Sequence, residues 1–146
     1  MVDISHKPPT FRRATAQGRV RLNQEAFRLV KENKTSKGDV LQVARVAGIM
    51  GAKKTSELIP LCHQVPLSQV KVDLMLDEDS QSVVVTVEAL TNHSTGVEME
   101  ALTGVQVCAL TIYDMCKSAG QEGMTVEEVR VVRKEGGKQG VVEFNK

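Results

Sequence analysis

Residues Thr95–Ser118 read TGVEMEALTGVQVCALTIYDMCKS, the longest run of helical periodicity without proline in the chain. Thr95 followed three residues later by Glu98 is a capping-box pattern for a helix start, and Gly120 supplies a stop. At about 100° per residue, one side of the predicted helix is wholly apolar and must be buried. That side carries Ala101, Leu102, Val105, Cys108, Ala109, Ile112 and Cys116.

The opposite side of this helix mixes aliphatic and ionisable residues, namely Thr103, Val107, Leu110, Asp114 and Lys117. A helix that faced water there would not need Val107 and Leu110, so we expect two buried faces, the second against another subunit. Asp114 and Lys117 are three residues apart and are therefore neighbours on this face. Two interpretations stay open: a surface ion pair, or a desolvated acid–base pair in a pocket at an interface.

The composition predicts a single domain, residues 1–146, that binds neither nucleic acid nor membrane. Nineteen basic against eighteen acidic residues leave a net charge of +1, and one Tyr, three Phe and no Trp argue against a base-stacking platform. Cys108 and Cys116 lie about 12 Å apart along one helix, too far for a disulfide, and Cys62 has no C-x-x-C partner. Free thiols and the lack of a secretory or membrane-length apolar run predict a cytoplasmic protein.

The order of the predicted elements is strand, two helices, hairpin, helix, strand, which indicates an α+β fold. It matches a split βαβ unit, with an antiparallel sheet and helices packed on one face. The second helix, VLQVARVAGIMGA, is apolar nearly all round and should be buried on more than one face. The segments are an arm (1–13), a strand (14–22), helices (23–33 and 38–51), a hairpin (69–90), the long helix, a strand (125–135) and a flexible Gly- and Lys-containing tail (135–146).

The segment KKTSELIPLCHQVPLS places Leu61, Cys62 and His63 between Pro60 and Pro66. The two prolines fix the backbone and argue against both helix and central strand. A rigid loop with a thiol and an imidazole is typical of a site, although a packed cysteine beside an exposed histidine explains the pattern equally well. No histidine or cysteine pair has zinc-like spacing, so we expect no structural metal.

Basic residues gather in the loops. Such clusters beside glycines or helix starts are compatible with a polyphosphate ligand, because cationic side chains and free backbone amides bind phosphate oxygens. The clusters are Arg12 and Arg13, Lys37, Lys53 and Lys54, and Lys134 and Lys138.

Two stretches, KGDVLQVARVAGIMGAKKTSELIPLCH and TGVEMEALTGVQVCALTIYDMCK, closely resemble the molybdenum cofactor biosynthesis protein C family, the cyclic pyranopterin monophosphate synthases. The likeness extends from Asp3 to about Gly140, and IPLCH, GVEMEALT and YDMCK are highly specific in combination. The resemblance implies a ferredoxin-like fold and a homohexamer built as a trimer of dimers. The arm residues that also match are Lys7, Thr10, Arg12 and Ala14.

The resemblance implies the chemistry too. The family converts a cyclised GTP derivative, 3′,8-cyclo-dihydro-GTP, which a radical enzyme makes upstream, to cyclic pyranopterin monophosphate with release of pyrophosphate, a lyase reaction. By analogy, Asp114 and Lys117 are the catalytic pair. No redox cofactor is expected, and a divalent ion such as Mg²⁺ would sit on the substrate phosphates rather than in a protein cage. The implied substrate-binding residues are Leu61, Cys62, His63, Met99 and Glu100, with Glu98, Lys37, Arg12, Lys53 and Lys134 as further members.

Two other functions stay open on the sequence. The same scaffold could carry a guanine-nucleotide-binding regulatory module without turnover, since fold does not fix function. It could also be a structural oligomerisation subunit whose Asp114–Lys117 pair is an interface ion pair. If the second face of the long helix meets a partner, we expect Lys37 or the Leu61–His63 loop of that partner to complete each site.

Two positions depart from the family pattern. Gly104 interrupts the long helix, which either costs up to about 1 kcal/mol or permits close approach of another helix. Glu135 places a carboxylate beside the basic tail, where the family usually has serine, and we expect it to weaken phosphate binding.

Overall fold

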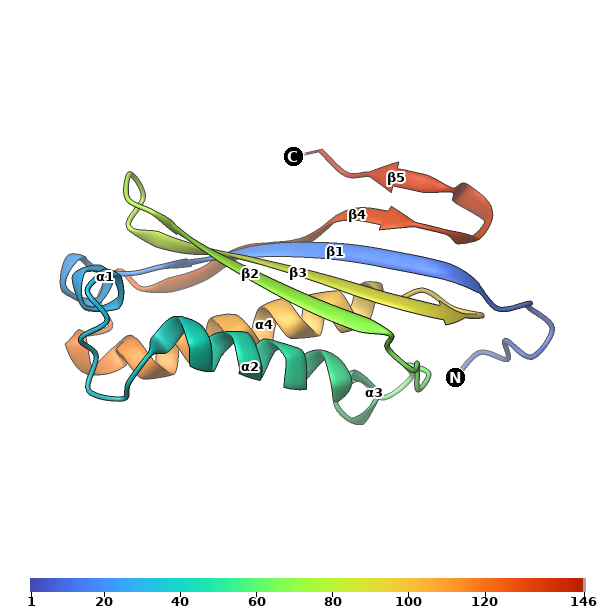
Figure 1. Cartoon of the computed structure of the whole chain (residues 1–146), viewed down its shortest axis with the longest axis horizontal. Coiled ribbons are helices and arrows are strands. Elements are labelled where there is room, and N and C mark those ends of the chain that lie inside the picture. Colours follow the sequence, from blue (N-terminus) through green and yellow to red (C-terminus); the bar gives the residue numbers. More distant parts are fainter. Residues whose placement is uncertain (146) are drawn as a thin grey trace.

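The computed structural model describes residues 1–145 as a five-stranded sheet with helices on one face (Figure 1). Lys146, the last residue of the predicted tail, lies outside the described residues. Over residues 1–145, no helix combines the length and the apolar character needed to cross a bilayer. The elements are β1 (Thr10–Arg21), α1 (Gln24–Lys31), α2 (Val40–Lys53), α3 (Thr55–Leu58), β2 (Gln69–Asp77), β3 (Ser82–His93), α4 (Glu98–Cys116), η1 (Lys117–Ala119), β4 (Thr125–Glu135), η2 (Gly137–Gln139) and β5 (Val141–Glu143).

Neighbouring strands pair antiparallel in the order β2-β3-β1-β4-β5. β3 therefore lies between the parallel strands β1 and β2, and β1 lies between the parallel strands β3 and β4. This is the split βαβ arrangement of ferredoxin-like folds, so the predicted fold class is confirmed. β5 extends the sheet beside β4.

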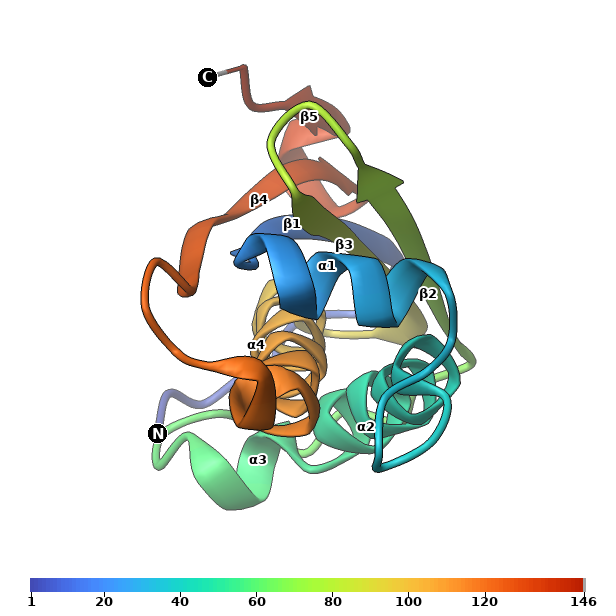
Figure 2. The same cartoon turned by 90° about the vertical axis from the view of Figure 1, so that its left-hand side faces the viewer.

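The core lies between the sheet and the pair α2 and α4, which run side by side across the same face, while α1 closes one end (Figures 1 and 2). Alternate residues of β1 and β3 point into this core, as the period of two along a strand requires. The predicted apolar side of α4 faces them and is buried, apart from the half-buried Leu102. Core residues include Ala14, Ala16 and Val20 of β1, Val83, Val85 and Val87 of β3, and Val105, Cys108 and Ile112 of α4.

α2 and α4 approach each other so closely at Gly48 and Gly104 that neither position has free space for a side chain. A Cβ on Gly104 would lie 2.9 Å from Val87 Cγ1 and 3.2 Å from the Gly48 carbonyl oxygen. Gly51 of α2 similarly lies against Val107. Of the two expectations for Gly104, close helix approach is the one confirmed.

Within the single chain, the second face of each long helix is only partly buried, so the expected burial of that face in an assembly stays a prediction. α2 of the same chain, rather than another subunit, covers Val107. Leu110 on α4 is 60% exposed, and α2 presents Val43, Val46 and Met50 to the surface. Over residues 1–145, one sheet packs against α2 and α4, and the outer sides of these two helices stay exposed.

The long helix begins later than the capping-box pattern predicted. α4 starts at Glu98, Val97 is its N-cap residue, and no side chain caps it. The Glu98 carboxylate lies beside Lys134, whose Nζ is 3.8 Å from Glu98 Oε1, and over residues 1–145 no hydrogen bond joins it to Thr95. The helix end is as predicted, because Gly120 follows η1 with φ 96°.

Both ends of the chain are more ordered than the sequence predicted. In the arm, His63 Nε2 donates to the Val2 carbonyl oxygen at 2.6 Å, and Ser94 Oγ donates to the Lys7 carbonyl oxygen at 2.8 Å. β1 then starts at Thr10, four residues before the predicted strand. The predicted flexible tail is wrong over residues 141–143, which form β5 and pair with residues 133–135 of β4.

Candidate functional site

Lys37, Asp114 and Lys117 form an ion-pair group at the C-terminal end of α4, here called the Asp114 cluster. Lys37 Nζ lies 2.7 Å from Asp114 Oδ2, and Lys117 Nζ lies 2.9 Å from Asp114 Oδ1. Asp114 and Lys117 meet because they are one helical turn apart, and Lys37 reaches them from the loop before α2. All three belong to one chain, so the expectation that a partner supplies Lys37 is wrong.

The Asp114 cluster is open to solvent in the single chain. The side chains of Asp114 and Lys117 are 53% and 50% exposed. Hydrogen bonds from Lys37 and Lys117 lower the pKa of Asp114 to about 2, and the hydrogen bond to Asp114 raises the pKa of Lys117. Both groups are ionised at neutral pH, as in a surface ion pair. A desolvated acid–base pair would need another chain to cover Asp114.

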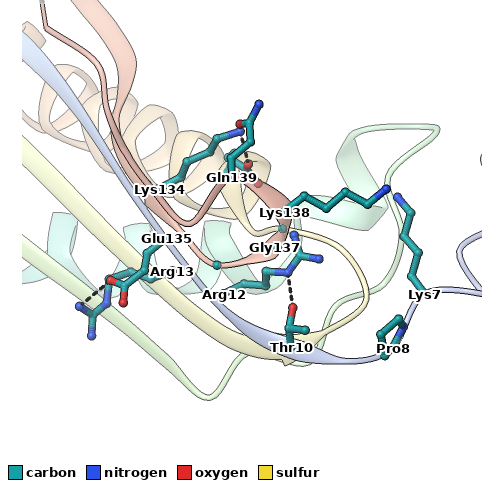
Figure 3. Close-up of a pocket in the computed structure, with 13 residues that line it drawn as sticks. Lys7, Pro8, Thr10, Arg12, Arg13, Lys134, Glu135, Gly137, Lys138 and Gln139 are labelled. Carbon is teal, nitrogen blue, oxygen red and sulfur yellow. Dashed lines mark hydrogen bonds and ion pairs between the residues drawn. The ribbon is translucent and has the colours of Figure 1, made fainter.

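A hollow of about 580 Å³ opens near the start of α4, where the arm, β1, β4 and the turn after β4 meet (Figure 3). We call it the basic pocket. Five cationic side chains line it against two carboxylates, an excess of three positive charges. The cations are Lys7, Arg12, Arg13, Lys134 and Lys138, the carboxylates are Glu98 and Glu135, and Pro8, Thr10, Gly96, Gly136, Gly137 and Gln139 complete the lining.

The pairing of β1 with β4 brings these cations together from opposite ends of the sequence. Arg12 and Lys134 both lie on the helix side of the sheet, because Ala14 is the register partner of Lys134 and Arg12 is two residues before Ala14. Arg12 Nε donates to Thr10 Oγ1 at 2.8 Å. Gly137 passes close to this guanidinium, since a Cβ there would lie 2.5 Å from Arg12 Nη1. The result is a cationic surface suited to phosphate oxygens.

Glu135 lies on the opposite face of the sheet from Lys134, since successive strand residues alternate. Its Oε2 is 3.4 Å from Arg13 Nη1 and 3.6 Å from Arg133 Nη2. Figure 3 shows it directed at Arg13 and away from Lys7 and Lys138. The carboxylate beside the tail is therefore paired with two guanidinium groups. Its expected weakening of phosphate binding stays a prediction.

A third group of predicted residues is formed by the Leu61–His63 loop and the first turn of α4. Leu61 and Met99 are exposed, whereas Glu100 is only 4% exposed. Burial raises the pKa of Glu100, and burial followed by the charge of Glu100 raises the pKa of the Cys62 thiol. A thiol with a raised pKa is a weak nucleophile at neutral pH. This favours a role in shape for Cys62.

The predicted site residues occupy opposite ends of α4. Sixteen positions separate Glu98 from Asp114, which corresponds to about 24 Å at ~1.5 Å per residue. Arg12, Glu98 and Lys134 meet in the basic pocket, while Lys37 and Lys117 meet around Asp114. Lys53 is exposed at the end of α2, and within residues 1–145 no hydrogen bond or ion pair joins it to the other predicted residues. A small-molecule site that included both ends would need two chains.

Sequence reasoning did not place Lys7 in the pocket, because the sequence does not show what holds the arm. The dipeptide Pro8-Pro9 directly after it was a usable signal, since prolines stiffen the approach to β1. Over the described residues, no three His, Cys, Asp or Glu side chains form a group that could hold a metal ion.

The ferredoxin-like fold and the basic pocket define a small α+β protein with a hollow lined by an excess of cationic side chains. Residues 1–137 match the MoaC family, and the chain belongs to this family. A relative from Heliobacterium modesticaldum is 53% identical over 140 residues, which cover 96% of this chain and 87% of the relative. A relative from Thermomicrobium roseum is 51% identical over 140 residues, or 96% of this chain and 84% of the relative. Both are named cyclic pyranopterin monophosphate synthase.

Proposed function

We propose that this protein is a cyclic pyranopterin monophosphate synthase of molybdenum cofactor biosynthesis. It converts 3′,8-cyclo-dihydro-GTP to cyclic pyranopterin monophosphate and releases pyrophosphate. The observation that carries the proposal is identity of about 50% to synthases over 96% of the chain. The net positive charge of the basic pocket supports it, because the substrate is a triphosphate and the leaving group is pyrophosphate.

In this proposal the basic pocket binds the phosphate chain. Closure of the cyclic phosphate expels pyrophosphate, whose developing charge must be offset by cations already in place. Arg12, Lys134, Lys7 and Lys138 supply these charges from four different segments. Glu98 stays beside Lys134 and orients it, at 3.8 Å. Leu61, Cys62, His63, Met99 and Glu100 contact the guanine-derived part of the substrate.

The skeletal rearrangement needs groups that both accept and donate protons, and we assign this work to Asp114 and Lys117. In the single chain, Asp114 has a pKa of about 2 and is a poor base at neutral pH. Burial by a second chain would raise that pKa and lower that of Lys117, bringing both toward the working range. The exposed Leu110, Val46 and Met50 give the two helices an apolar surface for such a partner.

The assembly we propose is a dimer that places the basic pocket of one chain beside the Asp114 cluster of its partner. Three such dimers form the homohexamer. The enzyme class that follows is a lyase, and the substrate comes from a radical enzyme upstream. The proposed reaction uses no redox cofactor, and a divalent ion such as Mg²⁺ is compatible with the substrate phosphates. We place the protein in the cytoplasm.

The test is turnover of the purified protein with 3′,8-cyclo-dihydro-GTP, with pyrophosphate and the pterin product measured separately. We expect both products to form at equal rates. Binding of the substrate without either product would support a regulatory module instead. Absence of both binding and turnover in the assembled oligomer would leave only the structural role.

A further inference from the structure

The face of the sheet behind the basic pocket carries a cross-strand charge pair to which the proposed chemistry gives no role. Arg13 of β1 and Glu135 of β4 are register partners, and Arg13 Nη1 lies 3.4 Å from Glu135 Oε2. Only 31% and 29% of the two side chains are exposed. Arg13 is also held by Glu88 of β3, 3.7 Å from its Nε, and its guanidinium lies 5.5 Å from the centroid of the Phe11 ring. Glu135, Glu88 and the Phe11 ring thus hold the Arg13 guanidinium in place.

This pair is the last register pair of the β1–β4 ladder. The chain then turns through residues 136–140, where Gly136, Gly137 and Gly140 have φ values of 99°, 73° and 64°. The Gly136 amide donates to the Gly140 carbonyl oxygen at 3.0 Å, and a Cβ at Gly136 would collide with the Phe11 carbonyl oxygen. Glycine has more backbone freedom than any other residue. A turn with three glycines therefore depends strongly on what anchors its ends.

We propose that Arg13 and Glu135 are positioning residues, which anchor this turn and thereby hold Lys138 and the turn's backbone amides at the basic pocket. The strand alternation keeps their own charges on the far face (Figure 3), so the pair acts on a phosphate ligand through geometry. The inference rests on the proposed function for the identity of the ligand. It assigns to Glu135 a supporting role in phosphate binding, the opposite of what its charge alone predicts.

The substitution Glu135→Gln separates the two effects. It keeps the size of the side chain and removes one negative charge close to the basic pocket. If charge alone matters, an anion binds more tightly; if the ion pair positions the turn, an anion binds more weakly. The probe is inorganic pyrophosphate, titrated by calorimetry into the full chain. We expect affinity to fall about two- to fivefold, the range of one cross-strand charge pair.

A matched control exists on the same two strands. Arg21 and Glu127 form a cross-strand ion pair of 2.8 Å near the other end of β1 and β4, so Glu127→Gln should leave the pyrophosphate affinity unchanged. Amide hydrogen exchange over residues 136–140 should become faster in Glu135→Gln and stay at the parental rate in Glu127→Gln.

Parental or tighter pyrophosphate binding by Glu135→Gln, together with unchanged exchange in the turn, would overturn the positioning role. A parent chain that binds no pyrophosphate would count against the phosphate site of the proposed function. Hydrogen exchange would then still decide whether the pair anchors the turn, because that measurement needs no ligand.

Discussion

The two ends of α4 carry charged groups that are built in contrasting ways. The Asp114 cluster combines a pair one helical turn apart with one lysine from a neighbouring loop, and it is exposed. The basic pocket collects residues from the arm, β1, α4, β4 and the turn after β4, and its volume is about 580 Å³. The first holds a single carboxylate between two cations, whereas the second holds an excess of positive charge.

This difference suggests a division of labour in the proposed reaction. A carboxylate between two lysines can exchange protons once it is desolvated, and a cationic hollow can bind phosphates as soon as the chain folds. The pocket is therefore preformed in one chain, while the Asp114 cluster depends on assembly for its chemistry.

The largest expected effect is on turnover at the Asp114 cluster. Asp114→Asn keeps the shape of the side chain and removes the base, so kcat should fall about 10²- to 10⁴-fold. Folding should be intact because the side chain is exposed. The control is Asp73→Asn, which breaks a similarly exposed pair with Lys71 at 3.0 Å and should leave kcat unchanged. Parental turnover by Asp114→Asn would end the assignment of the catalytic role.

The second prediction tests whether the two ends of α4 meet across a dimer. Lys134→Ala and Asp114→Ala proteins should each be inactive. After dissociation and mixed reassembly, about half of the dimers are heterodimers with one intact site, so roughly a quarter of parental activity should return. Steady-state assays after proven subunit exchange supply the measurement.

A mixture of Lys37→Ala with Asp114→Ala is the matched control for this experiment. These two groups lie 2.7 Å apart in one chain, so each heterodimer has two defective clusters and no activity should return. Recovery in this mixture, or none in the first, would contradict the proposed arrangement.

A third, smaller effect is expected on the stability of the fold, midway along α4, where Gly104 packs against β3 and α2. In Gly104→Ala, the new methyl group would lie 2.9 Å from Val87 Cγ1. Overpacking of this kind costs about 1–3 kcal/mol in unfolding free energy, and the better helix propensity of alanine offsets up to about 1 kcal/mol. Urea denaturation should show a net loss, whereas Gln106→Ala on the exposed side of α4 should not.

Sequence reasoning succeeded for contacts between residues close in the sequence and was incomplete for contacts between residues far apart in the sequence. Asp114 and Lys117 were predictable as neighbours because three residues along a helix fix the geometry. The antiparallel sheet of a split βαβ unit was predictable from the order of the elements, whereas β5 was not. The pocket was only partly predictable, since Lys7, Arg12 and Lys134 meet through pairing between the two ends of the chain. The direction of Glu135 depended on strand register, which a local pattern does not specify.

The smallest expected effect lies at the starts of α1 and α4, the second of which carries the predicted capping box at Thr95. Asn23 does cap α1: its Oδ1 accepts from the Ala26 amide at 2.8 Å, and its Nδ2 donates to the Gly120 carbonyl oxygen at 2.7 Å, just beyond the Asp114 cluster. Asn23→Ala should therefore cost about 1 kcal/mol or more of unfolding free energy. Thr95, in contrast, provides no cap for α4.

Thr95→Ala should change the unfolding free energy by less than about 0.5 kcal/mol, because α4 starts three residues later and the Glu98 carboxylate is directed to Lys134. Paired thermal or urea unfolding curves of the two variants supply the measurement. If Thr95→Ala lost as much stability as Asn23→Ala, the capping box would form in solution. The Glu98 carboxylate would then be drawn away from Lys134, which would leave the basic pocket with one more unpaired positive charge.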